Sequence, residues 1–143
     1  MPPSFRSDEG VVIYTDGASR KNPGPASCAF IIVSADDEIM LEFAAFLGDE
    51  TNNVAEYSAI IEAFTKTRDI TKGPVKLYSD SQLAMRQLTG VYKISKPHLA
   101  KMVKTVRELE NNFISVSYHH VPRENRFIRH CDALCNFVLD QCS

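Results

Sequence analysis

The chain has 143 residues, of which 44% are hydrophobic and 24% are charged. This is the composition of an ordinary globular domain that can bury one sizeable core. No apolar run approaches the roughly 18 residues of a membrane-spanning helix, and residues 1–10 lack the apolar stretch of a secretory signal. We therefore expect a monomeric cytoplasmic protein without a membrane partner, with a disordered lead-in over residues 1–10 and a single domain over residues 11–143.

The net charge of -2 conceals an uneven distribution of charge along the chain. Residues 1–65 carry 11 acidic and 3 basic side chains, whereas residues 66–143 carry 7 acidic and 13 basic ones. Two interpretations stay open. Either the acidic half holds metal ligands while the basic half faces a polyanion, or the charges are scattered over a solvated surface.

The first half of the chain is predicted to begin with strands. Runs of β-branched and aromatic residues indicate strands over residues 11–14, 27–34 and 39–47, separated by turn-rich segments. Apolar residues then recur at helical spacing over residues 54–64, and Asn52 or Asn53 is a suitable N-cap for this helix.

The second half alternates strands and helices. A strand is predicted over residues 75–79, a short helix over 81–88, and a longer helix that opens at Pro97. A fifth strand is predicted over residues 113–118, and a polar loop over 119–129 leads to a last helix that ends near Gln141. The order β-β-β-α-β-α-α-β-α predicts an α/β fold, with a five-stranded mixed sheet flanked by helices.

Four acidic residues lie at the predicted ends of these elements: Asp16, Glu56, Asp80 and Asp132. Each alone has an ordinary explanation as a turn residue, a helix cap, a charge near a helix start or a surface acid. If the first and fourth strands are neighbours, Asp16 and Asp80 share the crevice at the carboxyl ends of those strands. Converging acids repel one another unless cations neutralise them, so such a cluster would indicate divalent metal chemistry on a phosphate substrate.

The residues around these acids resemble the motifs of type 1 ribonuclease H. A T-D-G motif occupies residues 15–17, and an N-P-G-P loop follows at residues 22–25. The helix start T-N-N-x-x-E lies at residues 51–56, and D-S-Q lies at residues 80–82. In the last helix an acid followed by Ala-Leu begins at Asp132, and Asn136 also fits. The resemblance covers residues 11 to about 140.

The resemblance implies a ribonuclease H-like fold and a two-metal mechanism. Two Mg²⁺ ions, or Mn²⁺ in their place, would bind Asp16, Glu56, Asp80 and Asp132. The implied reaction is endonucleolytic hydrolysis of the RNA strand of an RNA–DNA hybrid, which leaves 5′-phosphate ends. The family's substrate-binding positions map onto Asn22, Thr51, Asn52, Asn53 and Gln82, and the basic pair Arg20 and Lys21 would add phosphate contacts.

The segment before Asp132 departs from the family pattern. The family carries a His or an Arg after the fifth strand that assists proton handling or product release. Here Arg123 is favoured for this role, with His120 and His119 as alternatives. Ile128 stands where an Asn is expected, which leaves Asn125, Arg129 or His130 to serve instead.

The basic protrusion of some family members is absent, because only a short loop with Lys93 and Lys96 separates residues 88 and 97. The remaining basic face consists of Lys101, Lys104 and Arg107. It either contacts the nucleic acid in place of the protrusion or is ordinary helix solvation.

Two other functions stay open: a non-catalytic nucleic-acid-binding module, and another nuclease or strand transferase of the same fold. The first would be favoured by a missing core acid, and the second lacks the N-P-G-P and T-N-N combination. The four cysteines, Cys28, Cys131, Cys135 and Cys142, are expected to be reduced, and those of the last helix to be buried. A zinc site that includes His130 is the alternative.

Overall fold

The structure is a computed structural model that describes residues 6–142. The expected disordered lead-in over residues 1–10 therefore falls partly outside the described residues. Within them, the backbone carbonyl of Ser7 accepts a hydrogen bond of 2.8 Å from the backbone N–H of Lys72. The hydroxyl of Thr71 donates to the carbonyl of Glu9. Residues 7–9 thus contact the loop that precedes the fourth strand.

The predicted order of elements is confirmed. The strands are β1 (Val11–Ser19), β2 (Gly24–Val33), β3 (Ile39–Glu50), β4 (Pro74–Ser79) and β5 (Ser115–His120). The helices are α1 (Asn52–Thr67), α2 (Gln82–Leu88), α3 (Pro97–Glu110) and α4 (Arg126–Cys142).

The five strands form one mixed sheet in the order β3-β2-β1-β4-β5. β1 pairs antiparallel with β2 and parallel with β4, so the first and fourth strands are neighbours, which is the condition for Asp16 and Asp80 to share one crevice. Since Thr15 pairs with Ser79 at the end of this parallel ladder, Asp16 and Asp80 follow it at the same edge of the sheet.

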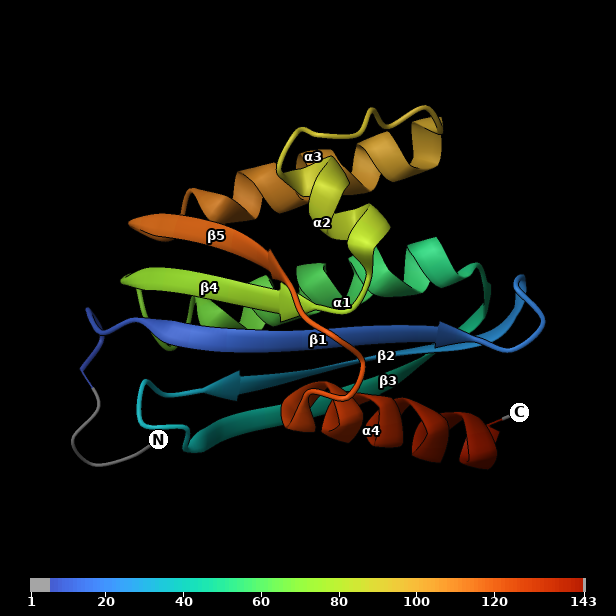
Figure 1. The fold of residues 1–143 in the computed structure, drawn as a ribbon, viewed down its shortest axis with the longest axis horizontal. Helices are drawn as coiled ribbons and strands as arrows, with labels where there is room; N and C mark the ends of the chain where they lie inside the picture. The colour runs from blue at the N-terminus through green and yellow to red at the C-terminus, as the bar shows by residue number, and fades with distance from the viewer. Residues whose placement is uncertain (1–5, 143) are drawn as a thin grey trace.

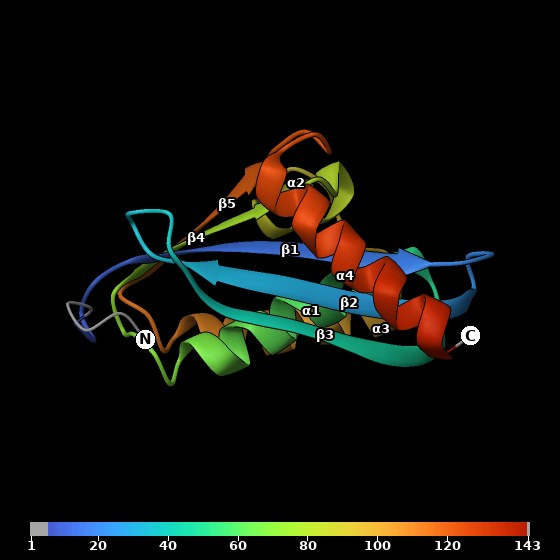
Figure 2. The same ribbon diagram turned by 90° about the horizontal axis from the view of Figure 1, so that it is seen from below.

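Helices cover both faces of the sheet (Figures 1 and 2). α4 packs on β1, β2 and β3 from one side, whereas α1 lies against the other side and α3 packs on α1. The sheet has a hydrophobic core on each face. Alternate residues of β1 belong to one core or the other, because successive side chains of a strand point to opposite faces. Ile13 joins Phe64 and Leu77 on the α1 side, while Tyr14 joins Ile31 and Ile128 on the α4 side. None of the described helices is long and apolar enough to cross a membrane.

Several boundaries differ from the sequence-based expectation. β1 extends to Ser19 and β3 to Glu50, beyond their predicted ends at residues 14 and 47, and β2 begins at Gly24, before its predicted start at residue 27, so Asp16 lies inside β1 and not after it.

Three further differences have an identifiable physical reason. The cap of α1 is Thr51, not Asn52 or Asn53, because the Thr51 hydroxyl accepts the Val54 N–H at 3.2 Å. β5 begins at Ser115, two residues later than predicted, since its pairing with β4 starts at Pro74 and Ser115. α4 begins at Arg126, inside the expected loop, because the Asn125 side chain accepts the N–H groups of the first helical turn.

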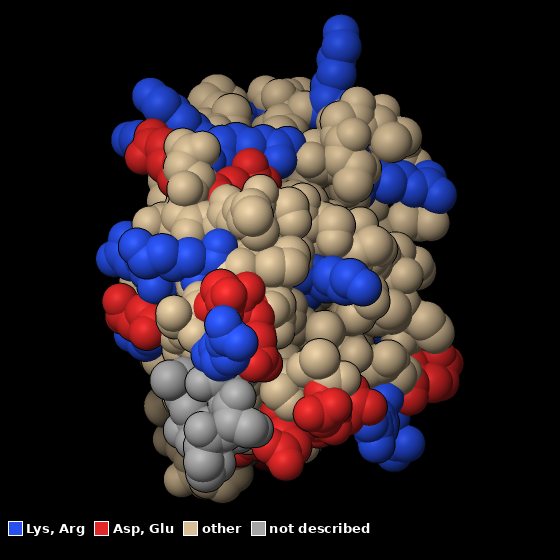
Figure 3. All heavy atoms as spheres, turned by 90° about the vertical axis from the view of Figure 1, so that its left-hand side faces the viewer, with Lys and Arg blue, Asp and Glu red and all other residues tan. Residues whose placement is uncertain are grey.

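Charge is mixed at the end of the molecule where β4 and β5 begin. Figure 3 shows lysine and arginine side chains interspersed with aspartate and glutamate on this face. On this end of the molecule, the alternative of scattered solvated charge describes the surface better than a single basic face.

The contact between β1 and α1 at Gly17 is unusually close. A Cβ atom at Gly17 would lie 2.4 Å from the backbone carbon of Ala55 and 2.4 Å from the backbone nitrogen of Glu56. Both neighbours are backbone atoms, so neither can move aside without a shift of the helix.

We predict that Gly17→Ala destabilises the protein by about 3 kcal/mol, because overpacking of a rigid contact forces the backbone apart. Urea unfolding followed by circular dichroism measures this loss. The control is Gly48→Ala, where a Cβ meets no atom within 4 Å and the positive φ of 76° alone opposes the substitution, at about 1 kcal/mol. Equal losses at the two positions would contradict the steric explanation.

Candidate active site

Three carboxylates from distant parts of the chain meet at the edge of the sheet. Asp16 lies in β1, Glu56 in the second turn of α1, and Asp80 directly after β4. One oxygen of each carboxylate lies within 4.8 Å of the others. Asp16 is only 5% exposed and Glu56 only 8%. Carboxylates that are both buried and this close are unusual, because each disfavours the charge of the next.

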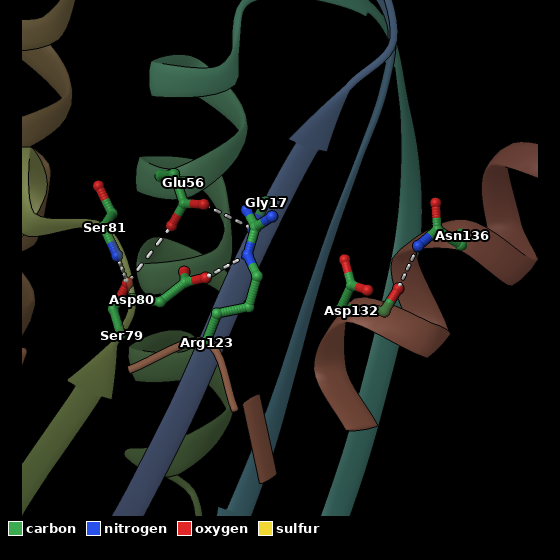
Figure 4. Close-up of polar contacts among 8 residues, drawn as sticks. All are labelled: Gly17, Glu56, Ser79, Asp80, Ser81, Arg123, Asp132 and Asn136. Atoms are coloured by element: carbon green, nitrogen blue, oxygen red, sulfur yellow. Dashed lines mark hydrogen bonds and ion pairs between the residues drawn. The ribbon is translucent and has the colours of Figure 1, made fainter. Parts of the chain in front are cut away.

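The orientation of Glu56 is fixed by two neighbouring strands (Figure 4). The Gly17 N–H donates to Glu56 Oε1 at 3.0 Å, and the Ser79 hydroxyl lies 3.4 Å from Glu56 Oε2. Ser79 Oγ in turn accepts the Ser81 N–H at 3.0 Å. Glu56 therefore bridges β1 and the end of β4. The Ser79 hydroxyl connects Glu56 to Ser79 and Ser81, the residues directly before and after Asp80.

The fourth acid, Asp132, comes from α4 on the other side of β1 (Figure 4). It lines the same cleft of about 360 Å³ as Asp16, Glu56 and Asp80. α4 is anchored beside β1 and β2, since Ser27 Oγ donates to the Cys135 carbonyl at 3.0 Å. Cys135 Sγ also lies 3.7 Å from the carbonyl oxygen of Asp16. All four predicted acids thus share one cleft.

Burial and mutual repulsion change the acidity of the cluster. Burial, followed by the charges of Asp80 and Asp132, raises the pKa of Asp16 from 3.8 to about 7. Burial also raises the pKa of Glu56, with a further contribution from Asp16 and Asp80. Ionisation of the cluster is therefore unfavourable near neutral pH unless a cation compensates it. Clustered carboxylate oxygens are ligands that hard divalent cations prefer, so the side chains present fit such a metal.

The cleft contains some of the other predicted site residues. Asn52, Asn53 and Arg123 line it together with the four acids. The predicted residues that lie outside its lining are Asn22, Thr51, Gln82 and His120.

Asn22 and Asn52 hold the loop between β1 and β2 against the start of α1. The side-chain oxygen of Asn22 accepts the backbone N–H of Asn52 at 2.9 Å. The side-chain oxygen of Asn52 accepts the Ser19 N–H at 2.8 Å. Each side chain therefore uses its oxygen for the scaffold, and its NH₂ group is the remaining hydrogen-bond donor.

Arg123 is the auxiliary candidate that contacts an acid of the cluster. Its Nε lies 3.3 Å from Asp80 Oδ2, although the side chain is 81% exposed. His119 instead contacts Ser117 Oγ at 2.9 Å, and His130 pairs with Glu42 at 2.6 Å. Asn125 caps α4.

Two of the predicted basic contact residues are engaged within the protein. Arg20 pairs with Asp140 of α4 at 2.7 Å. Arg107 donates to the Leu88 carbonyl at 2.6 Å and pairs with Glu110 at 2.9 Å. Lys101 and Lys104 remain exposed on α3.

The cysteines are all free thiols. Cys28, Cys131 and Cys135 are buried, whereas Cys142 is exposed, contrary to expectation, because it lies in the last turn of α4. Between residues 6 and 142, the only group of side chains with metal-binding geometry is the acidic one. The zinc alternative therefore has no assembled site in this part of the chain.

The supporting roles of Gly17, Ser79 and Asn125 were not anticipated. Gly17 is the last residue of the T-D-G motif, Ser79 directly precedes the D-S-Q motif, and Asn125 lies outside the recognised motifs. The sequence signals were the glycine at a strand position and the side-chain oxygen of Asn125 just before an apolar helix.

The sequence was compared with protein families and with individual known proteins. The reverse transcriptase-like family matches residues 14–138. Ribonuclease HI of Halobacterium salinarum is 42% identical over 127 residues, which are 89% of this chain and 63% of that protein. The bifunctional protein Rv2228c of Mycobacterium tuberculosis is 34% identical over 91% of this chain and 35% of its own length. The chain thus spans less than two thirds of these relatives.

Solved structures of ribonuclease H proteins are similar to this chain in both fold and sequence. The crystal structure of RNase H1 from Halobacterium salinarum has a TM-score of 0.88 at 41% identity, covering 93% of this chain and 99% of that one. LC11-RNase H1, solved in complex with an RNA/DNA hybrid, has a TM-score of 0.85 at 33% identity, covering 92% of this chain and 97% of that one.

The sheet order and the clustered acids define a ribonuclease H-like domain. With these identities over nearly the whole described length, the chain belongs to the type 1 ribonuclease H family.

We predict that Asp16→Asn stabilises the metal-free protein, and more so at high pH. The pKa of Asp16 is raised in the folded state, so the folded protein holds this proton more tightly than the unfolded chain does. Its contribution to stability is therefore lost as the pH rises from about 4 to about 7. The amide removes this penalty, and we expect a gain of about 4 kcal/mol at pH 8 that falls to less than half of that at pH 5.

Urea unfolding in EDTA at both pH values measures this difference. Asp69→Asn, at an exposed position after α1, is the control, because it removes a carboxylate of the same type outside the cluster. If the difference in stability between Asp16→Asn and the parent is the same at pH 5 and pH 8, the explanation based on the raised pKa of Asp16 is contradicted.

Proposed function

We propose that the protein hydrolyses the RNA strand of RNA–DNA hybrids endonucleolytically, leaving 5′-phosphate ends. The observation that carries this proposal is the cluster of Asp16, Glu56 and Asp80, whose ligand oxygens lie within 4.8 Å of one another. A similar structure supports the substrate class, because LC11-RNase H1 was solved in complex with an RNA/DNA hybrid.

The proposed metal ligands are Asp16, Glu56, Asp80 and Asp132. Two divalent ions, Mg²⁺ or in its place Mn²⁺, supply activation of the attacking water and stabilisation of the leaving 3′ oxygen when bound. The protein's own contribution is orientation. Gly17 and Ser79 hold the Glu56 carboxylate, and the β1–β4 ladder sets Asp16 beside Asp80. The raised pKa of Asp16 supports a cation requirement, since a cation removes the cost of ionising the cluster.

The proposed contacts with the hybrid come from polar side chains around the cleft: Asn22, Thr51, Asn52, Asn53 and Gln82. The NH₂ groups of Asn22 and Asn52 suit phosphate oxygens and 2′-hydroxyls, because their side-chain oxygens already accept backbone N–H groups. Thr51 supports this surface indirectly by capping α1. Gln82 is exposed at the start of α2, close in sequence to Asp80.

Arg123 is proposed as the auxiliary residue, and its contact with Asp80 supports this choice. A guanidinium stays protonated at all relevant pH values, so it cannot accept a proton. Its role is therefore electrostatic: a cation beside Asp80 stabilises negative charge that develops on the reacting phosphate.

A non-catalytic binding module is disfavoured because all four acids are present and share the cleft. The monomeric state, the cytoplasmic location and the extent of the single domain over residues 11–143 stay predictions.

Incubation with a labelled RNA–DNA hybrid in Mg²⁺ tests the proposed activity. We expect cleavage of the RNA strand by the parent, and a loss of at least about 100-fold in Asp80→Asn, because the amide is a weaker ligand and leaves the cluster short of negative charge. Asp69→Asn should cleave like the parent. No cleavage by the parent, or full activity of Asp80→Asn with a normal fold, would refute the proposal.

Arg123→Ala is expected to lower kcat roughly 100-fold with a smaller change in KM, and Arg123→Lys to recover part of the loss. The pH dependence of kcat should keep its shape, since the guanidinium does not titrate in the accessible range. His120→Ala tests the alternative assignment under the same conditions. A larger loss of kcat in His120→Ala than in Arg123→Ala would show that the auxiliary role belongs to the histidine.

A further inference from the structure

A row of rings crosses the sheet directly before the catalytic carboxylates. Tyr14 of β1 pairs in register with Tyr78 of β4, and Tyr78 pairs with His119 of β5. The ring centroids of Tyr14 and Tyr78 are 5.3 Å apart, and those of Tyr78 and His119 are 5.0 Å apart. Phe127 of α4 closes the row at 4.7 Å from Tyr14.

The outer half of this row lies on a part of the sheet that is accessible. α4 packs over β1, β2 and β3, and Figure 1 shows no helix in front of β4 and β5 on that side. On β4 and β5 the residues of this face include exposed Lys76, Ser115 and Ser117 beside partly exposed Tyr78 and His119. The alternate residues of the same strands, such as Leu77, face the opposite core. We call the surface formed by Lys76, Tyr78, Ser115, Ser117 and His119 the open face.

The open face is continuous with the candidate active site. Tyr78 precedes Asp80 by two residues in the same strand direction, and Tyr14 precedes Asp16 in the same way, so one pleat separates the rings from the acids. Lys76 lies a further two residues back, about 13 Å from Asp80 along the strand. A hollow of about 390 Å³ lined by Val12, Ala35, Pro74 and Lys76, among others, extends the surface beyond that point.

The chemistry of the open face suits a single strand of nucleic acid. Partly exposed rings can stack with bases or pack on sugars, which is a sequence-tolerant contact. The ammonium of Lys76 can neutralise a phosphate, and the hydroxyls of Ser115 and Ser117 can meet a 2′-hydroxyl. Of the acids around this face, Asp37 on the turn between β2 and β3 pairs with Arg126 at 3.0 Å, and Glu9 lines the hollow together with Lys76. In a duplex the bases are already stacked and paired, so these rings would gain little from one.

The geometry points to a second binding surface: the open face holds single-stranded RNA that continues from the RNA strand in the active site. This inference rests on the proposed function, because it takes the strand at the carboxylates to be RNA. It adds a path for the segment of RNA that has left, or never entered, the hybrid.

The test measures binding of a labelled single-stranded RNA of about 12 nucleotides by fluorescence anisotropy, in EDTA at low salt so that no cleavage occurs. The test variant is Lys76→Ala with His119→Ala. The matched control is Lys66→Ala with His98→Ala, which removes the same side-chain types from exposed positions of α1 and α3. Thermal melting of both variants establishes that each is folded.

We expect the test variant to bind the RNA at least about fivefold more weakly than the parent, and the control to stay within about twofold. Unchanged affinity of the folded test variant, or an equal loss in the control, would overturn the inference. It would also be overturned if light scattering showed a dimer that the test variant abolishes while RNA affinity is kept, because the face would then bind a second copy. Cleavage of a blunt hybrid by the parent in Mg²⁺, measured separately, shows whether a failure belongs to this inference or to the proposed function.

Discussion

The close approach of α1 to β1 at Gly17 is the constraint on which the site depends. Because Gly17 has no Cβ, the backbone of Ala55 and Glu56 can lie against the strand, and the Gly17 N–H can reach the Glu56 carboxylate at 3.0 Å. The parallel pairing of β1 with β4 then brings Asp80 to the same edge as Asp16. An acid in α1, an acid in β1 and an acid directly after β4 therefore converge at positions fixed by the sheet and the helix, which keeps the geometry precise enough for metal binding.

This convergence is unfavourable for the protein alone. Asp16 and Glu56 are buried, and burial raises the pKa of both; the charges of Asp80 and Asp132 raise that of Asp16 further, and those of Asp16 and Asp80 raise that of Glu56. The hydrogen bonds from Gly17 and Ser79 offset part of the cost for Glu56, and Arg123 at 3.3 Å offsets part of it for Asp80. The cost of ionising the carboxylates that these contacts leave uncompensated favours the binding of a cation between them. Function and local instability thus have the same physical origin, as is common for sites where like charges are held together.

Much of this could be predicted from the sequence, for identifiable reasons. The element order followed from periodicity, and the four acids followed from motifs that each combine an acid with a specific element boundary. The start of β5 depends on a long-range contact that local patterns do not encode, because Pro74 is the partner of Ser115. The start of α4 depends on a local cap, since the Asn125 side chain accepts N–H groups of the first turn within a segment that looks like a polar loop. Arg20 looks like a free cation in sequence, but Asp140 engages it from 120 residues away. Arg107 pairs with Glu110, only three residues further along the same helix.

The central claim is that the four carboxylates hold a pair of divalent ions when the substrate is present. Electron paramagnetic resonance of Mn²⁺ tests this directly, with the protein bound to a hybrid whose RNA strand carries methylenephosphonate linkages, in which a P–C bond replaces the bond to the leaving 3′ oxygen and prevents cleavage. The account predicts two bound ions per chain with the magnetic coupling of ions about 4 Å apart, and loss of that coupled signal in Asp16→Asn. Binding of no ion, or of ions that show no coupling, would contradict it.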